Sequence, residues 1–140
     1  MKKILVSSCL LGNNCRYDGG NCHNKQVIAY LKDKEYITVC PEELGGLPTP
    51  RLPSEIVKDK VLNIKGEDVT AAFVLGANKV IELAKKHSIE LAICKSESPS
   101  CGLGIIHDGT FSGNLIEGNG ICVNLFLEKG IKVISEKDLV

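Results

Sequence analysis

The chain has no net charge, few aromatic residues and no long hydrophobic run. Seventeen basic side chains balance seventeen acidic ones, and three Tyr, three Phe and no Trp account for 4% of the 140 residues. Without a positive field or a stacking surface, the chain is poorly suited to binding nucleic acid. No segment approaches the roughly 18 consecutive apolar residues of a membrane span. We therefore expect a small-molecule partner, and neither nucleic acid nor a membrane.

The first residues also lack the features of a secretion signal. The apolar run after Lys3 is interrupted by Ser7 and Ser8, and no small-residue cleavage site precedes the Gly- and Asn-rich stretch that follows. We expect a cytoplasmic protein, in which the seven cysteines stay reduced. Reduced cysteines pack in a core, ligate a metal or cluster, or act in catalysis.

Short apolar runs and helical periodicities alternate along the chain. Asn24 and Asp68 stand where helix caps are expected, and Gly130 stands where the last helix should stop. Strands are predicted at 3–7, 35–39, 90–94 and 131–135, helices at 25–32, 69–87 and 121–129, and a β-hairpin around 58–60. This alternation predicts one α/β domain over residues 1–140. It should be Rossmann-like and three-layered, with a mainly parallel sheet and helices on both faces.

Three cysteines stand in loops that follow predicted strands. Cys9 follows the first strand, Cys40 follows the second, and Cys101 comes seven residues after Cys94, where a later strand ends. Carboxyl ends of parallel strands meet at one sheet edge, where ligands bind in α/β folds, so we expect these three thiols close together. The chain has no CxxC pair, which weakens the hypothesis of a zinc knuckle. An iron–sulfur cluster, a zinc site and inert packing nevertheless remain open at this point.

A carboxylate and several hydroxyls stand beside these cysteines. Glu42, two residues after Cys40, could move a proton in catalysis. The segment around Cys101 supplies hydroxyls and exposed backbone amides, which can tune a cluster or bind an anionic substrate atom. The residues of that segment are Ser98, Ser100 and Gly102.

Two arginines in the loops are candidate substrate-binding residues. Arg16 follows Cys15 in the first loop, and Arg51 lies between Pro50 and Pro53. A guanidinium is a planar fork that suits a carboxylate, a carbonyl or a phosphate. Either arginine could instead pair with a loop carboxylate.

The remaining cysteines have different expected roles. Cys15 is six residues after Cys9 and could be a fourth thiolate ligand or a catalytic thiol. Cys94 ends an apolar strand and Cys122 opens the apolar face of a helix, so both are expected in the core. Cys22 is expected in a loop or at a helix entry.

The order of these motifs resembles the thiouracil desulfurase family. The resemblance rests on residues 8–19 (SCLLGNNCRYDG), 40–51 (CPEELGGLPTPR) and 98–102 (SPSCG), and it spans nearly the whole chain. It implies a [4Fe–4S] cluster with Cys9, Cys40 and Cys101 as its three ligands. A fourth iron would then capture the sulfur of a thiolated nucleobase, and water would replace that sulfur at carbon without net redox change.

The resemblance also implies residue roles. Glu42 would transfer protons, and the hydroxyl of Ser98 would position the substrate or an intermediate. Two other functions stay open at this stage. One is another Lewis-acid reaction at an open iron, such as hydration or dehydration, and the other is a non-catalytic zinc or redox-sensing module.

Overall fold

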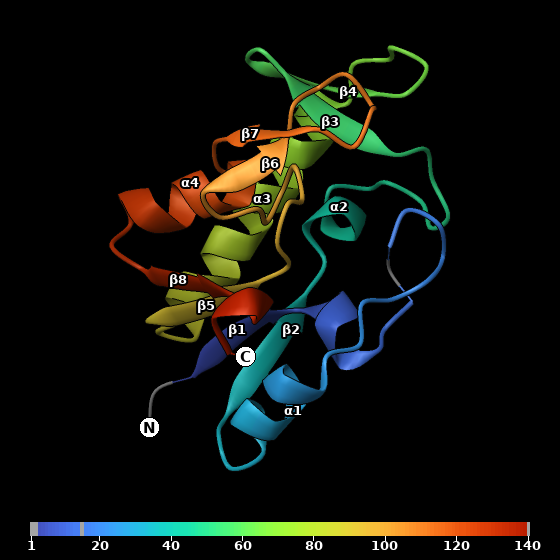
Figure 1. Cartoon of the computed structure of the whole chain (residues 1–140). Helices are drawn as coiled ribbons and strands as arrows, with labels where there is room; N and C mark the ends of the chain where they lie inside the picture. The colour runs from blue at the N-terminus through green and yellow to red at the C-terminus, as the bar shows by residue number, and fades with distance from the viewer. Residues whose placement is uncertain (1–2, 15, 140) are drawn as a thin grey trace.

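Four short parallel strands form the centre of the fold. The computed structural model describes residues 3–14 and 16–139, and within them the strand order of this sheet is β2-β1-β5-β8 (Figure 1). The strands are β1 (Ile4–Ser7), β2 (Tyr36–Val39), β5 (Leu91–Cys94) and β8 (Lys132–Ser135). In the register of the sheet, Leu5 lies opposite Ile37 of β2 and Ala92 of β5. All four residues of β1 are buried because it is central and covered on both faces.

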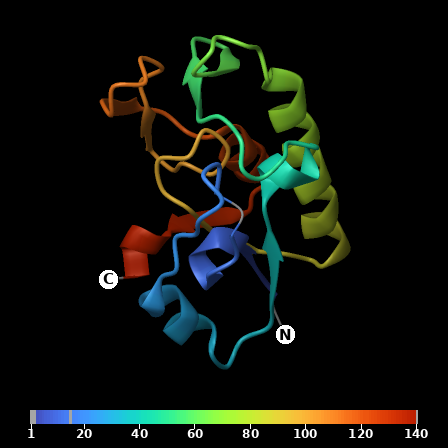
Figure 2. The same cartoon turned by 90° about the vertical axis from the view of Figure 1, so that its right-hand side faces the viewer.

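Helices cover both faces of this sheet. On one side lie α1 (Lys25–Leu31) and the short 3-10 helices η1 (Ser8–Leu11) and η2 (Glu136–Leu139). On the other lie α3 (Thr70–Lys86) and α4 (Ile121–Glu128), and the turned view shows α1 and α3 on opposite sides (Figure 2). Successive strand residues point to opposite faces of the sheet. Leu5 therefore packs in the buried cluster on the side of α3 and α4 (the α3–α4 core), and Val6 packs in the cluster on the side of α1 (the α1 core). The predicted three-layer α/β fold is confirmed.

The helix ends follow the predicted signals closely. Asn24 caps α1, its side-chain oxygen accepting a hydrogen bond from the amide of Val27 at 3.0 Å. Asp68 accepts a hydrogen bond from the amide of Thr70 at 2.9 Å, although the N-cap position of α3 falls on Val69. Gly130 follows α4 with a φ of 75°, a left-handed conformation that glycine adopts without strain.

Two hairpins lie beyond the carboxyl ends of the parallel strands (Figure 1). The predicted hairpin is present as β3 (Ser54–Val57) and β4 (Lys60–Asn63), paired antiparallel. A second hairpin, β6 (Ile105–His107) and β7 (Leu115–Glu117), lies where only a loop was predicted. That prediction was wrong because each strand has three residues and β7 is exposed throughout, so neither shows a buried apolar run. Among the described residues, no helix has the length and apolar character needed to cross a membrane.

A fourth helix, α2 (Pro41–Leu44), also lies in a predicted loop. Pro41 occupies its first turn, a position that proline favours because its missing N–H has no helical partner there. The backbone of α2 lies directly on α3. A Cβ on Gly45 would be 1.9 Å from the carbonyl oxygen of Ala72, and one on Gly76 would be 1.9 Å from that of Pro41. Two glycines therefore determine how closely α2 approaches α3.

Candidate active site

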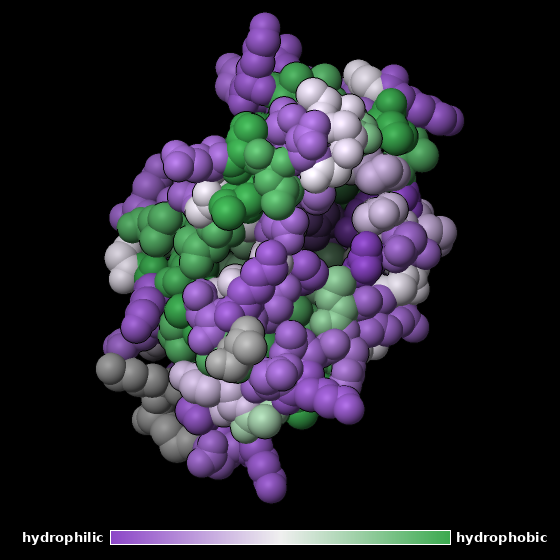
Figure 3. Space-filling model, viewed as in Figure 1, coloured by the Kyte–Doolittle hydropathy of each residue, from purple (hydrophilic) through white to green (hydrophobic). Residues whose placement is uncertain are grey.

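A cavity of about 460 Å³ opens at the carboxyl ends of β1, β2 and β5. The loops after these strands form one wall, and the two hairpins form the other. The space-filling view shows a hollow between these parts (Figure 3). Among the residues that the structure describes, four cysteines line the cavity: Cys9, Cys22, Cys40 and Cys101. The three cysteines predicted to meet at this edge therefore do line one cavity.

Different elements place the thiols of Cys9 and Cys40. Cys9 lies in η1, directly after β1, and its carbonyl accepts a hydrogen bond from the amide of Gly12 at 3.2 Å. Cys40 directly follows β2 and is the N-cap residue of α2. Each position therefore depends on the end of a strand and on the short helix that follows it.

Cys101 is placed by its own loop and by α4. Its amide donates to the hydroxyl oxygen of Ser98 at 3.1 Å. The first amides of α4 hold the same loop, because Ile121 donates to the carbonyl of Pro99 and Cys122 to that of Ser100, both at 2.9 Å. Cys101 is only 4% exposed, so this loop holds it inside the protein at the cavity wall.

Cys22 is a cavity-lining thiol that sequence reasoning missed. Its amide donates to the carbonyl of Cys9 at 2.9 Å, which folds the first loop back onto the strand end. Its side chain lies beside that of Arg16. Partial burial disfavours the charge of Arg16, but the neighbouring Cys22 and Asp18 outweigh it and raise the pKa of the arginine above its ordinary value. No local signal in the sequence points to Cys22, because its place depends on the hydrogen bond to Cys9 across a loop of irregular backbone.

Glu42 lies at the centre of a buried polar group. Its carboxylate accepts a hydrogen bond from the thiol of Cys40 at 3.5 Å, and the guanidinium of Arg51 is 3.9 Å from the same oxygen. Arg51 also donates to the hydroxyl of Thr49 at 3.1 Å, and its amide donates to the carbonyl of Tyr17 at 2.6 Å. Arg51 is thus positioned to orient Glu42, in addition to any contact with a substrate.

The structure separates the three predicted residues around Cys101. Ser98 lines the cavity, and its hydroxyl oxygen accepts hydrogen bonds from the amides of Ser100 and Cys101, both at 3.1 Å. Ser100 is fully buried and Gly102 is buried, and neither is part of the cavity wall. A Cβ on Gly102 would be 2.7 Å from the carbonyl oxygen of Ser98. Direct substrate contact is therefore expected from Ser98, while Ser100 and Gly102 shape the loop.

Two further thiols lie behind Cys101. Cys94 and Cys122 are 1% and 0% exposed and belong to the α3–α4 core, as predicted. A hydrogen bond with Cys101, together with burial, raises the pKa of Cys94, and burial raises that of Cys122. Thiols that stay protonated are weak ligands and weak nucleophiles, which is consistent with a packing role.

The donor set of the cavity fits an iron–sulfur cluster better than a single metal ion. Among the residues that the structure describes, no three Cys, His, Asp or Glu side chains are close enough to hold one ion. A four-iron cluster is larger than an ion and is held by thiolates that lie farther apart. The cavity has room for it and offers Cys9, Cys40 and Cys101 at its wall. Cys15, the predicted additional ligand, lies outside the described residues.

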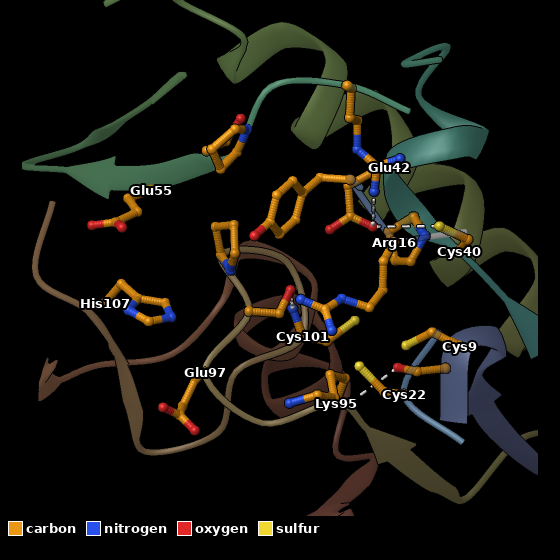
Figure 4. A pocket seen from close by; sticks show the side chains of 18 of the residues that line it. Cys9, Arg16, Cys22, Cys40, Glu42, Glu55, Lys95, Glu97, Cys101 and His107 are labelled. Atoms are coloured by element: carbon orange, nitrogen blue, oxygen red, sulfur yellow. Dashed lines mark hydrogen bonds and ion pairs between the residues drawn. The ribbon is translucent and has the colours of Figure 1, made fainter. Parts of the chain in front are cut away.

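Figure 4 shows how the labelled side chains divide the cavity. Cys9, Cys22 and Cys40 gather at one end, Glu42 and Arg16 lie between, and the opposite end carries three further labelled residues: Glu55, Glu97 and His107. Fold and site together define an α/β enzyme with a thiol-lined pocket at the carboxyl edge of its sheet.

Comparison with known proteins assigns this enzyme to a family. A sequence model of the 2-thiouracil desulfurase family matches residues 4–138. The chain is 41% identical over 146 residues to the uncharacterized protein YbbK of Bacillus subtilis (strain 168), and the match covers 97% of each. It is 40% identical to the solved structure of TudS, a [4Fe–4S]-dependent thiouracil desulfidase, with a TM-score of 0.93 over 99% of this chain and 93% of that one. The chain belongs to the 2-thiouracil desulfurase family, and the family predicted from the motifs is confirmed.

Proposed function

We propose that this chain is a [4Fe–4S]-dependent desulfurase that converts a thiolated pyrimidine of the thiouracil type to its oxo form and releases sulfide. Cys9, Cys40 and Cys101 are the proposed cluster ligands. The observation that carries the proposal is the meeting of these three thiols with Glu42 and Ser98 in one cavity. Family membership and the activity for which TudS is named support the same reaction.

The reaction balances without electron transfer. The C=S carbon gains the oxygen of water, the C–S bond breaks, and sulfur leaves as hydrogen sulfide, so nothing is oxidised or reduced. When bound on three thiolates, the cluster supplies an iron with no protein ligand, which is a Lewis acid with affinity for soft sulfur.

The residues of the chain then manage protons and orientation. Glu42 is buried and oriented by Arg51, so its carboxylate can take a proton from the attacking water and return it to the departing sulfur or to a ring nitrogen. Ser98 accepts two amide hydrogens and can still donate its own proton to a substrate atom. Arg16 lines the cavity close to Cys22 and is a candidate partner for a pyrimidine carbonyl.

The proposed setting follows from composition. With zero net charge and few aromatic residues, the chain offers little attraction to nucleic acid, so a free thiolated base or a related small molecule is the proposed partner. We place the enzyme in the cytoplasm and treat residues 1–140 as one domain.

Anaerobic turnover tests the proposed reaction. Reconstituted protein is incubated with 2-thiouracil and, separately, with 4-thiouracil, and uracil and sulfide are quantified. Equal amounts of the two products from either substrate support the proposal, while Cys101→Ala treated in the same way should form neither. An iron-loaded wild type that leaves both substrates unchanged would contradict it, as would a colourless protein that takes up zinc.

A further inference from the structure

Beyond the residues near the thiols, we propose that Glu55 is a positioning residue that holds Phe111 in the cavity wall and thereby sets substrate affinity. The inference rests on the proposed function, since Phe111 would pack against the flat ring of a thiolated pyrimidine. Glu55 and Phe111 both line the cavity. Glu55 lies at the end opposite Cys9 and Cys40 (Figure 4).

Glu55 connects the two hairpins that form the outer wall. It is in β3, is 8% exposed, and one of its carboxylate oxygens accepts hydrogen bonds from the amides of Gly109 at 3.0 Å and Phe111 at 3.2 Å. Both amides belong to the turn between β6 and β7, more than fifty residues away in sequence. Hydrogen bonds to a buried carboxylate are stronger than neutral ones, so this contact is a strong clamp between the hairpins.

The clamped turn holds Phe111 in a backbone conformation that this residue does not favour. Phe111 has a φ of 56°, a left-handed conformation that bulky side chains rarely adopt. Gly109 has a φ of 89°, and a Cβ there would be 2.7 Å from the carbonyl oxygen of Ile56. The turn also has hydrogen bonds of its own, such as that from the amide of Asp108 to the carbonyl of Asn114 at 3.0 Å. Glu55 adds the contacts that hold Gly109 and Phe111 against β3, so loss of its carboxylate should release these two residues from β3.

Phe111 belongs to an unusual concentration of aromatic residues. The chain has only six Tyr and Phe residues, and three of them line this one cavity: Tyr17, Phe73 and Phe111. An aromatic side chain can stack on the flat face of any nucleobase. A contact remote from the reacting sulfur binds substrate and transition state alike, so its removal raises KM and leaves kcat unchanged.

Steady-state kinetics of the reconstituted holoenzyme test the inference with 2-thiouracil as the probe. We expect Phe111→Ala and Glu55→Ala each to raise KM about tenfold, with kcat within twofold of the wild type. Glu55→Gln keeps an acceptor oxygen and should restore most of the affinity. The double variant should be no worse than Phe111→Ala alone, because Glu55 acts through Phe111. The inference would be overturned if the double variant raised KM about a hundredfold, the product of the two single effects. It would also be overturned if Glu55→Gln had a KM as high as that of Glu55→Ala.

Amide hydrogen exchange supplies a readout that needs no turnover. In substrate-free holoenzyme, exchange in the segment 108–113 should be at least tenfold faster in Glu55→Ala than in the wild type, and close to wild type in Glu55→Gln. Unchanged exchange in Glu55→Ala contradicts the clamp. If the wild type fails to desulfurate thiouracil, the proposed function fails while exchange still reports on Glu55. If Glu55→Ala does not fold, Glu55→Asp replaces it, because a carboxylate one carbon shorter is withdrawn from the amides of Gly109 and Phe111. Wild-type exchange and KM in Glu55→Asp would contradict the clamp.

Discussion

Glu42 is the residue on which proton transfer should depend most. Glu42→Gln keeps the size of the side chain and a hydrogen-bond acceptor near Cys40, so the cluster absorbance should be retained. Removal of a general acid–base group should lower kcat by about 10²- to 10⁴-fold. The neighbouring Glu43 is exposed and bonds to Thr49, so Glu43→Gln is the matched control and should stay near wild type. Wild-type turnover in Glu42→Gln would rule out the proton-transfer role.

The predictability of single residues depended on their distance from a strand end. Cys9 and Cys40 were predicted at the sheet edge because each follows a recognisable strand directly. Cys22 was not, since its place depends on a hydrogen bond to Cys9 that crosses a loop of irregular backbone. Ser100 was predicted to bind substrate from its position beside Cys101, but the direction of its side chain is set by packing.

At the scale of elements, the contact between α2 and α3 should be intolerant of one added methyl group. In an ordinary helix interior, replacing Gly by Ala stabilises the protein. In Gly76→Ala the new Cβ would overlap the backbone of Pro41, so we expect a loss of about 3 kcal/mol in the free energy of unfolding. Asn78→Ala, on the exposed face of the same helix, should gain about 0.5 kcal/mol. Urea unfolding of both variants measures the difference, and a more stable Gly76→Ala would disprove the close approach.

A second prediction at this scale concerns the tether between the loop after β5 and η2. The ammonium group of Lys137 is 2.9 Å from the carboxylate of Glu97, and this hydrogen bond lowers the pKa of Glu97 and raises that of Lys137. Because the carboxyl pKa is lower in the folded state, the stabilisation is present above the unfolded value of about 4.3 and is lost as pH falls through the folded value. Lys137 is largely exposed, so the effect should be below about 1 kcal/mol.

Unfolding experiments at several pH values check this tether. Lys137→Met should lower the free energy of unfolding slightly at pH 7 and reduce the loss of stability between pH 5 and pH 3, relative to wild type. If the free energy of unfolding fell equally between pH 5 and pH 3 in the two proteins, the ion pair would contribute nothing measurable.

The elements that the sequence could not reveal are those held by tertiary contacts. The parallel strands and α1, α3 and α4 have apolar periodicity of their own, and their ends were predicted within about two residues. By contrast, α2 has four residues and is placed by glycines that lie 31 positions apart, Gly45 and Gly76. The hairpin of β6 and β7 is attached through Glu55, a residue of another hairpin. No local pattern encodes such attachments.

At the scale of the whole molecule, the cavity lies between the sheet edge and the hairpins, so cluster loading should stabilise the fold. A group that binds only the folded state raises stability by mass action. We expect reconstitution to raise Tm by about 10 °C in the wild type. Cys101→Ala should show no such rise under the same anaerobic conditions. Calorimetry of loaded and unloaded protein measures the shift, and equal shifts in both proteins would indicate binding elsewhere.

The central claim is that three cysteines from three loops hold the cluster. Its most direct test is the iron and labile sulfide content of the wild type and of single alanine variants, each reconstituted without oxygen. The wild type, Cys22→Ala and Cys15→Ala should contain about four irons and four sulfides per chain. Each variant of the proposed ligands Cys9, Cys40 and Cys101 should lose most of both. The proposed ligand set would be contradicted if any of those three variants kept a full cluster while Cys22→Ala or Cys15→Ala lost it.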